Sequence, residues 1–514
     1  MKALLCDYQE IISNLKGNQY FGRFGKTFST NNAKYFYDTG TGKVLQVNDD
    51  VHKLLSYLLE HDGEFDDINT LKMSRDEFEK AFSEILSSIE SENILSIPEY
   101  SGMIGYSRET LDKEYKKVGN LTLELTEDCN LRCKYCIYHP SHPNFREFTK
   151  KKMTFETAKK AIDIFNDHTG YDEELYIGFY GGEPLMNYKL LKQCVEYAEE
   201  SMRDKKINFS MTTNATLITK RVSEFLIDHP FQITISLDGP LEVHDRNRIF
   251  INNKGSYQAT MRGIKNLVEV SEEKGVRPPI GFNMVNAGPN IEENYELMQQ
   301  LIDSTDWLPP NPPATTTTVD NGPTKIEYVL PQSQEEREIL YDTYDPLLKW
   351  TRDEKESKEK KLFSDGSLNQ GLLNVHNRII QNDPVDTCGM NGCCLPGQRR
   401  IYVATDGKFY PYEKVGNTYP IGNVDDGFDM EGIHQKYIED YVDESNKVCK
   451  NCWAINMCGL CYVNCYDDKG ANFDFRHDSC VSERQFIENN LSYYHELLEK
   501  DSESLEYLNE MEML

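Results

Sequence analysis

The distribution of cysteine is the feature that most constrains how this chain of 514 residues can fold. Three of its fourteen cysteines stand between residues 129 and 136, nine stand between 388 and 480, and Cys6 and Cys194 stand alone. Disulfides are rare in reducing compartments, so clustered cysteines in a chain without an export signal favour metal binding. Cys194 shares helical spacing with Leu190, Leu191 and Val195, which predicts a buried core position instead.

Composition argues against two classes of partner. The formal net charge is −29 at pH 7, whereas a nucleic-acid-binding surface needs clustered lysine and arginine. No apolar run approaches the roughly 18 residues of a membrane-spanning helix, and the N-terminus lacks the apolar core of a signal peptide. We therefore expect a cytoplasmic protein with neither a nucleic-acid nor a membrane partner.

Short apolar runs alternate with amphipathic helical stretches between residues 119 and 335, which predicts an α/β fold with a parallel sheet. The expected strands are Leu121–Leu125, Tyr176–Tyr180, Phe209–Thr212, Ile233–Leu237, Ile280–Met284 and Lys325–Leu330. The expected helices include Thr154–Phe165, Tyr188–Met202 and Tyr257–Val270. The Pro/Thr-rich stretch 306–321 is predicted to be a loop without regular structure. Such folds carry their chemistry on loops at the carboxyl ends of the strands.

The flanking segments have different patterns. Residues 1–100 predict a small α+β module, with a hairpin of Ala33–Tyr37 and Val44–Val47 and helices over Asp50–Glu60 and Ser74–Ile89. A plain structural cap is the alternative role for it. Residues 336–385 are interpreted as a helical bridge, 386–485 as a cysteine-rich domain and 486–514 as a C-terminal helix.

The first cysteine group follows the first expected strand. Cys129, Cys133 and Cys136 lie on one loop, and three thiolates can hold three irons of a [4Fe–4S] cluster while the fourth iron stays open. This spacing resembles that of the radical SAM superfamily, a resemblance that implies a partial (β/α)6 barrel. It also implies that the open iron binds S-adenosylmethionine (SAM), whose reductive cleavage gives a 5′-deoxyadenosyl radical. A zinc site with a distant fourth ligand is the alternative.

Three further motifs follow later strands in the order of that superfamily. Tyr180–Pro184 resembles its GGEP turn, Thr212–Asn214 its ribose-facing turn, and Ser236–Arg248 its SLDGP…HDxxR stretch. His244 and Asp245 could instead form only a helix-start turn. The resemblance implies SAM contacts from Gly181, Gly182, Glu183, Pro184, Asn214, Ser236 and Arg248.

The C-terminal cysteines resemble those of the SPASM domain, which carries two auxiliary [4Fe–4S] clusters. For the first cluster the resemblance implies Cys388 and Cys394 with either Cys461 or Cys465. Tyr412 ends the turn that begins at Gly407, where the family has a cysteine, and is therefore a candidate ligand. Two zinc sites are the alternative. The ligands implied for the second cluster are Cys449, Cys452, Cys458 and Cys480.

Residues 20–95 resemble a PqqD-like, winged-helix recognition module, which grips the leader of a precursor peptide by strand addition. The stretches Phe409–Val415 and Cys452–Cys461 together resemble those of sactipeptide and ranthipeptide thioether synthases. This resemblance implies thioether formation in a ribosomally synthesised, cysteine-containing precursor peptide, with flavodoxin or ferredoxin as electron donor. Carbon–carbon crosslinking, epimerisation, formylglycine formation on a sulfatase and a non-catalytic iron–sulfur scaffold are the alternatives. No catalytic acid or base can be named from the sequence.

Overall fold

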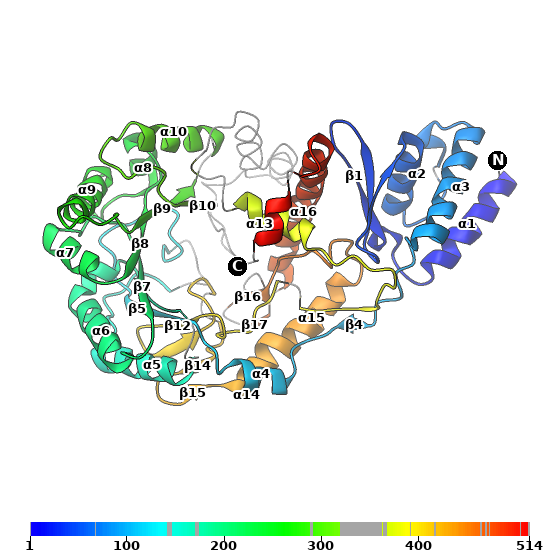
Figure 1. Cartoon of the computed structure of the whole chain (residues 1–514). Coiled ribbons are helices and arrows are strands. Elements are labelled where there is room, and N and C mark those ends of the chain that lie inside the picture. Colours follow the sequence, from blue (N-terminus) through cyan, green and yellow to red (C-terminus); the bar gives the residue numbers. More distant parts are fainter. Residues whose placement is uncertain are drawn as a thin grey trace.

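The structure is a computed structural model of the whole chain. It describes residues 2–66, 68–140, 146–169, 174–287, 291–318, 362, 367–390, 392–415, 418–462, 465–467, 470–471, 473–503 and 505–511. The strand expected at Lys325–Leu330 and most of the helical bridge lie outside these residues. Figure 1 shows a curved sheet with its helices at one end, the N-terminal residues at the other, and the C-terminal elements between them. No described helix has the length and apolarity that crossing a membrane would require.

Residues 120–318 form a parallel sheet whose neighbouring strands follow one another in sequence, as predicted. Leu121, Leu123 and Leu125 are fully buried in its first strand, so every second residue of that strand packs into the core. The strands are β5 (Asn120–Thr126), β6 (Leu175–Gly181), β7 (Ile207–Thr213), β8 (Phe231–Ser236), β9 (Ile280–Asn286) and β10 (Ala314–Thr318). The helices between them are α5 (Phe155–Asp167), α6 (Tyr188–Ser201), α7 (Lys220–Asp228), α8 (Leu241–Asn247), α9 (Tyr257–Glu273) and α10 (Ile291–Asp303). They cover the outer side of the curved sheet (Figure 1).

The prediction that residues 306–321 lack regular structure is wrong in part. Ala314–Thr318 form β10, which pairs in parallel with β9 from Ala314 opposite Phe282 to Thr318 opposite Asn286. Threonine is β-branched and favours strands, and the exposed edge of β9 offers it a partner. The prolines end at Pro313, just before the strand, where they remove no hydrogen bond from the ladder.

The cysteine-rich segment continues the same sheet. β12 (Ile401–Val403) pairs in parallel with β5, and β13 (Lys408–Tyr410), β14 (Gly422–Asn423) and β15 (Gly427–Phe428) follow as antiparallel strands. Because β13 runs antiparallel to β12, the turn between these two strands lies toward the carboxyl ends of the parallel strands. Two helices complete the segment: α15 (Asp440–Cys449) and α16 (Phe473–Lys500). α16 begins at Phe473, earlier than the C-terminal helix that was predicted from residue 486. Its first turns were not predicted, because the apolar residues of this helix show little helical periodicity.

The N-terminal segment is a three-stranded antiparallel sheet with helices on one face. The expected hairpin forms as β2 (Lys34–Asp38) and β3 (Val44–Val47), and β1 (Gly25–Ser29), which the sequence did not predict, pairs with β2. Phe36 packs with the apolar side chains of α2 (Asp49–Glu60) and α3 (Arg75–Glu92). α1 (Lys2–Lys16), also not predicted, lies on the same side.

The other face of this sheet packs against the C-terminal end of the chain. Phe28, Tyr35 and Tyr37 share a buried cluster with Leu491 of α16 and Leu372 of α13 (Ser367–His376). Figure 1 shows β1 directly beside α16. The N-terminal sheet is therefore enclosed between its own helices and the C-terminal helices.

Candidate active site

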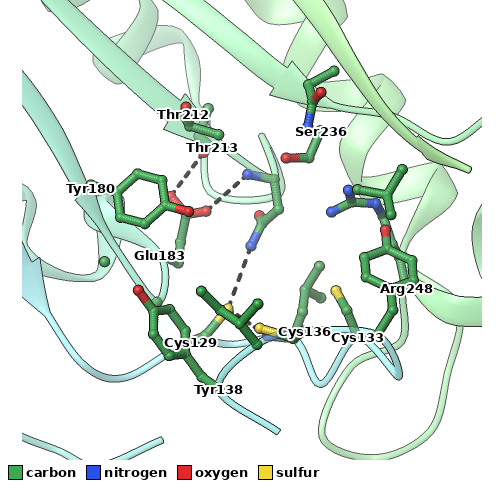
Figure 2. Close-up of a pocket in the computed structure, with 18 of the residues that line it drawn as sticks. Cys129, Cys133, Cys136, Tyr138, Tyr180, Glu183, Thr212, Thr213, Ser236 and Arg248 are labelled. Carbon is green, nitrogen blue, oxygen red and sulfur yellow. Dashed lines mark hydrogen bonds between the residues drawn. The ribbon is translucent and has the colours of Figure 1, made fainter. Parts of the chain in front are cut away.

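A cavity opens at the carboxyl ends of the parallel strands, and Figure 2 shows its lining. The loop after β5 contributes Cys129, Cys133 and Cys136, and the later strand ends contribute most of the other residues predicted from motifs. Those residues are Gly181, Gly182 and Glu183 after β6, Asn214 after β7, Ser236 at the end of β8, and Arg248 after α8. Among the described residues Pro184 is not part of this lining; it is buried at the start of η3 (Pro184–Asn187).

The three cysteines form one wall of the cavity. Burial raises the pKa of all three thiols, that of Cys133 to about 12. They are therefore neutral near pH 7 unless a cation such as iron stabilises the thiolate. No three His, Cys, Asp or Glu side chains in the described ranges lie close enough to hold a single metal ion. An iron–sulfur cube spreads its thiolates over different irons, and three thiols facing one cavity suit that donor set.

Two glycines bring the end of β6 against the cysteine loop. A Cβ on Gly181 would lie 2.3 Å from the carbonyl oxygen of Thr126, and one on Gly182 would lie 2.2 Å from that of Asp128. Gly181 also has φ of +135°, a conformation that favours glycine. The motif glycines therefore allow β6 to pack against the chain that leads into Cys129.

Glu183 is a buried carboxylate that ties two strand ends together. It accepts hydrogen bonds from the backbone N–H of Leu185 (3.1 Å), the Thr213 hydroxyl (2.8 Å) and the backbone N–H of Asn214 (2.9 Å). Burial raises the pKa of Glu183 to about 7, and the three hydrogen bonds offset only part of that rise. An additional N–H donor in the cavity would favour the ionised form further.

Glu183→Gln is expected to weaken SAM binding by roughly tenfold or more, because a hydrogen bond to a charged group is worth about 1.5–3 kcal/mol. The reconstituted enzyme would be measured by equilibrium dialysis. Glu127→Gln is the matched control: Glu127 is also buried but accepts from the hydroxyls of Thr149 and Thr405. Equal losses in both variants would mean that Glu183 has no specific role at the cavity.

Asn214 fastens the cysteine loop to the end of β7. Its Nδ2 donates to Asn130 Oδ1 at 3.0 Å and lies 4.0 Å from Cys129 Sγ, while its Oδ1 accepts from Thr216. Both polar atoms of the Asn214 amide are therefore hydrogen-bonded within the protein. Thr212 and Thr213 line the cavity beside Asn214.

Arg248 is held by groups that the sequence analysis missed. Its Nε lies 2.9 Å from Asp238 Oδ1, a buried ion pair whose angle is poor for a hydrogen bond. The Tyr135 hydroxyl donates to Asp238 Oδ2 at 2.5 Å, and the backbone N–H of Val285 donates to Oδ1 at 3.1 Å. Asp238 is the aspartate of the SLDGP stretch, so the motif itself could have identified it as a residue of the site.

His244 and Asp245 have structural positions. His244 Nδ1 accepts from the backbone N–H of Asp238 at 3.4 Å, its Nε2 lies 3.1 Å from Ser256 Oγ, and burial lowers its pKa to about 3. Asp245 accepts from the backbone N–H of Tyr257, the first residue of α9. These contacts favour the helix-turn interpretation of the pair.

The cysteine-rich segment reaches the same cavity. Lys414 lines it together with Tyr138 and Tyr180. The Tyr412 ring lies 5.6 Å from the Arg400 guanidinium, and Tyr412 is close enough to Tyr180 for their charges to interact. Sequence reasoning did not find Lys414, because only the pairing of β12 with β5 brings it here.

Two of the remaining cysteines lie beside tyrosine hydroxyls. Cys388 Sγ lies 3.5 Å from the Tyr100 hydroxyl, and the charge of Cys449 also acts on that phenol. Cys394 Sγ lies 3.4 Å from the Tyr462 hydroxyl, on which the charges of Cys393 and Cys461 also act. Cys465 and Cys480 are buried, while Cys452 and Cys458 are partly exposed.

Residues 123–298, which hold most of the cavity, match the family model described as the Radical SAM superfamily. SAM and a [4Fe–4S] cluster are the cofactors of this superfamily, and their prediction is confirmed. A central parallel α/β sheet of the radical SAM type is confirmed as well.

Curated relatives extend the similarity beyond that region. A cysteine-type anaerobic sulfatase-maturating enzyme from Clostridium novyi (strain NT) is 26% identical over 398 residues, covering 73% of this chain and 96% of the relative. A radical SAM cyclopropyl synthase from Paramaledivibacter caminithermalis is 29% identical over 162 residues, covering 30% of this chain and 34% of the relative.

A solved structure shows a similar fold. It is native anSMEcpe with bound AdoMet and Cp18Cys peptide, and it aligns with a TM-score of 0.54 at 21% identity. The alignment covers 77% of this chain and 100% of that chain.

Proposed function

We propose that the chain is a radical SAM peptide maturase that joins a cysteine sulfur to a carbon atom within a ribosomally synthesised precursor peptide. The observation that carries this proposal is the shared cavity, walled by the cysteine triplet on one side and by Lys414 of the cysteine-rich segment on another. A substrate bound there would contact both the cysteine triplet and the cysteine-rich segment. The sulfatase-maturating relative, which matches over nearly its whole length, supports a peptide or protein substrate.

Different residues of the cavity bind the cluster, the SAM carboxylate and the SAM amino group. Cys129, Cys133 and Cys136 hold the cluster, Arg248 and Ser236 face the SAM carboxylate, and Glu183 accepts from its amino group. When bound, SAM and the reduced cluster supply the radical that takes a hydrogen atom from the substrate. The buried walls keep water from that radical.

The two auxiliary clusters are part of this proposal. Cys388 and Cys394 with Cys461 or Cys465 would hold the first, and Cys449, Cys452, Cys458 and Cys480 the second. Formation of a thioether removes two hydrogen atoms from the peptide. The radical derived from SAM would take one of them as a hydrogen atom, and the other would leave as a thiol proton and one electron. Clusters in the cysteine-rich segment would accept that electron, with flavodoxin or ferredoxin as the expected external partner.

The first auxiliary cluster has two candidate arrangements, which differ in whether the Tyr412 phenolate binds an iron. A phenol is a poorer ligand than a thiolate for an iron–sulfur cluster, so an iron could stay open for the substrate's cysteine. We then expect Tyr412→Phe to leave the Mössbauer spectrum of the peptide-free enzyme unchanged, and a cysteine-containing peptide to perturb it. A Cys→Ser peptide should have no effect. A spectrum altered by Tyr412→Phe alone would make the phenolate a ligand and contradict the open site.

The N-terminal sheet offers an edge to a leader peptide. β3 is an outer strand, and Lys43 and Asn48 at its two ends bond Glu92 and Glu84 of α3, so α3 runs beside it. The backbone N–H of Asp38 donates to the Lys43 carbonyl. Hydrogen-bonded pairs alternate along such a ladder, so the N–H of Gln46 points to the free edge. These features support strand addition by a peptide at β3.

Gln46→Pro is therefore expected to weaken binding of the precursor leader by about tenfold, because it removes one outward N–H without breaking the β2–β3 ladder. Fluorescence anisotropy with a labelled precursor measures the affinity. Gln46→Ala, which keeps the N–H, is the control and should bind normally. Undiminished binding by Gln46→Pro would exclude β3 as the docking edge. Deleting residues 1–100 is a poor test, since it would expose the apolar faces of α13 and α16.

A second candidate function is conversion of a cysteine in a sulfatase to formylglycine. The length of the match to the sulfatase-maturating relative favours it. The N-terminal sheet favours the precursor peptide, because a protein-sized substrate needs no leader-binding edge.

A further inference from the structure

Arg23 is a buried cation at the end of η1 (Phe21–Arg23), in the N-terminal segment. Only 2% of its surface is exposed. One guanidinium nitrogen donates to the Pro98 carbonyl at 3.0 Å and to the Gln19 side chain, whereas Nε is buried without a hydrogen-bond partner. Burying a charge is costly unless an opposite charge compensates for it, so this guanidinium requires an anion.

Burial lowers the pKa of Arg23, and the neighbouring Tyr100 and Cys388 offset part of that effect. Among the residues that the structure describes, Arg23 forms no ion pair with an aspartate or glutamate. The guanidinium carbon lies 5.3 Å from the centre of the Tyr100 ring, and the Tyr100 hydroxyl lies 3.5 Å from Cys388 Sγ. The compensating anion therefore belongs on the side of Cys388.

Backbone pairing fixes Cys388 against this part of the chain. β11 (Thr387–Cys388) pairs with β4 (Gly102–Met103), and the N–H of Ile104 donates to the Cys388 carbonyl at 2.7 Å. Asn446 holds the same unit, because its Oδ1 accepts from the Tyr100 hydroxyl and from the N–H of Met103, both at 2.8 Å.

The N-terminal segment is also fastened to the loop between Cys452 and Cys458. The Thr39 hydroxyl donates to the Trp453 carbonyl at 2.8 Å, and Asn456 Nδ2 donates to the Thr39 carbonyl at 2.8 Å. Arg23 therefore belongs to a rigid unit that contacts the cysteine-rich segment in two places.

We propose that Arg23, a positioning residue acting through Tyr100, balances the negative charge of the auxiliary cluster held by Cys388 and sets its reduction potential. The inference rests on the proposed role of Cys388 as a ligand. A cubane cluster bound by thiolates is anionic, and reduction adds a further negative charge. A nearby buried cation favours the reduced state and raises the potential, and so does a hydroxyl whose single proton can turn from Asn446 to a ligand sulfur. The N-terminal segment would thus tune an auxiliary cluster as well as bind peptide.

The test uses the full chain with Cys129, Cys133 and Cys136 replaced by alanine, so that only auxiliary clusters give signals. Their potentials are measured by redox titration followed by electron paramagnetic resonance. Arg23→Gln is expected to lower one potential by about 60 mV, a tenfold change in a one-electron equilibrium, and to leave the other unchanged. Arg23→Lys should restore most of the loss, and Tyr100→Phe should lower the same potential. Arg108→Gln, which removes an exposed arginine, is the control and should change neither.

Unchanged potentials in Arg23→Gln at full iron content would overturn the proposal. If Arg23→Gln fails to fold, Tyr100→Phe decides, and an unchanged potential there would overturn it equally. The ligand assignment is tested separately by Cys388→Ala. Full auxiliary iron and unaltered signals in that variant would remove Cys388 as a ligand, whatever Arg23 does.

Discussion

Replacing Cys129, Cys133 and Cys136 together with alanine is expected to abolish formation of 5′-deoxyadenosine from SAM. The three thiols share one cavity wall, and their burial leaves them neutral unless iron holds them as thiolates. Without the cluster, no electron reaches SAM at this site. The measurement is chromatography of dithionite-reduced enzyme with SAM, and a loss of at least a thousandfold, down to background, is expected.

The control for this loss is the remaining iron. Since the cysteines proposed to hold the auxiliary clusters lie on β11 and in the segment after it, the variant should keep its auxiliary iron and sulfide and its far-ultraviolet circular dichroism. Continued cleavage of SAM by the triple variant would contradict the assignment of the cavity.

Asp238→Asn is expected to destabilise the protein by about 3–5 kcal/mol, because it leaves the Arg248 guanidinium buried without its partner. Arg248 and Asp238 are both almost fully buried and lie 2.9 Å apart. Binding of SAM should also fall by tenfold or more, since Asp238 orients the guanidinium of Arg248, which we propose to bind the SAM carboxylate. Chemical denaturation followed by circular dichroism measures the first effect, and equilibrium dialysis measures the second.

A double variant separates the ion pair from the rest of the fold. Replacing a buried ion pair by apolar groups is often close to neutral. Asp238→Asn with Arg248→Met should therefore recover part of the stability but none of the SAM binding. A double variant less stable than the single one would show that Asp238 stabilises the fold through Tyr135 and Val285 rather than through Arg248.

The central sheet could be predicted because apolar residues recur at every second position of its strands, where they are buried. Apolar runs such as Leu121–Leu125 and Ile280–Met284 have few other interpretations, and their order set the positions of the motif residues. Cys129, Glu183, Ser236 and Arg248 consequently meet in one cavity. β10 was missed because four threonines after prolines carry no apolar pattern, and only the free edge of β9 makes them a strand.

Contacts between distant parts of the chain could not be predicted. The apolar residues of β1 and β2 fit a small independent sheet, yet Phe28 and Tyr37 pack against α16 and α13. Lys414 reaches the cavity through the pairing of β12 with β5, and Arg23 reaches the neighbourhood of Cys388 through Tyr100. Sequence periodicity reports the environment of a residue along its own element but not the identity of its distant partner.

Mass spectrometry of a cysteine-containing precursor peptide, encoded beside this gene and produced together with the enzyme, tests the central claim most directly. The account predicts a peptide that has lost two hydrogen atoms and whose cysteine no longer reacts with iodoacetamide, as a thioether requires. The triple alanine variant should return the unmodified peptide. A peptide that keeps its free thiol in the presence of active enzyme, or that carries a hydrazine-reactive aldehyde, would contradict thioether formation, and the aldehyde would establish the sulfatase-type reaction instead.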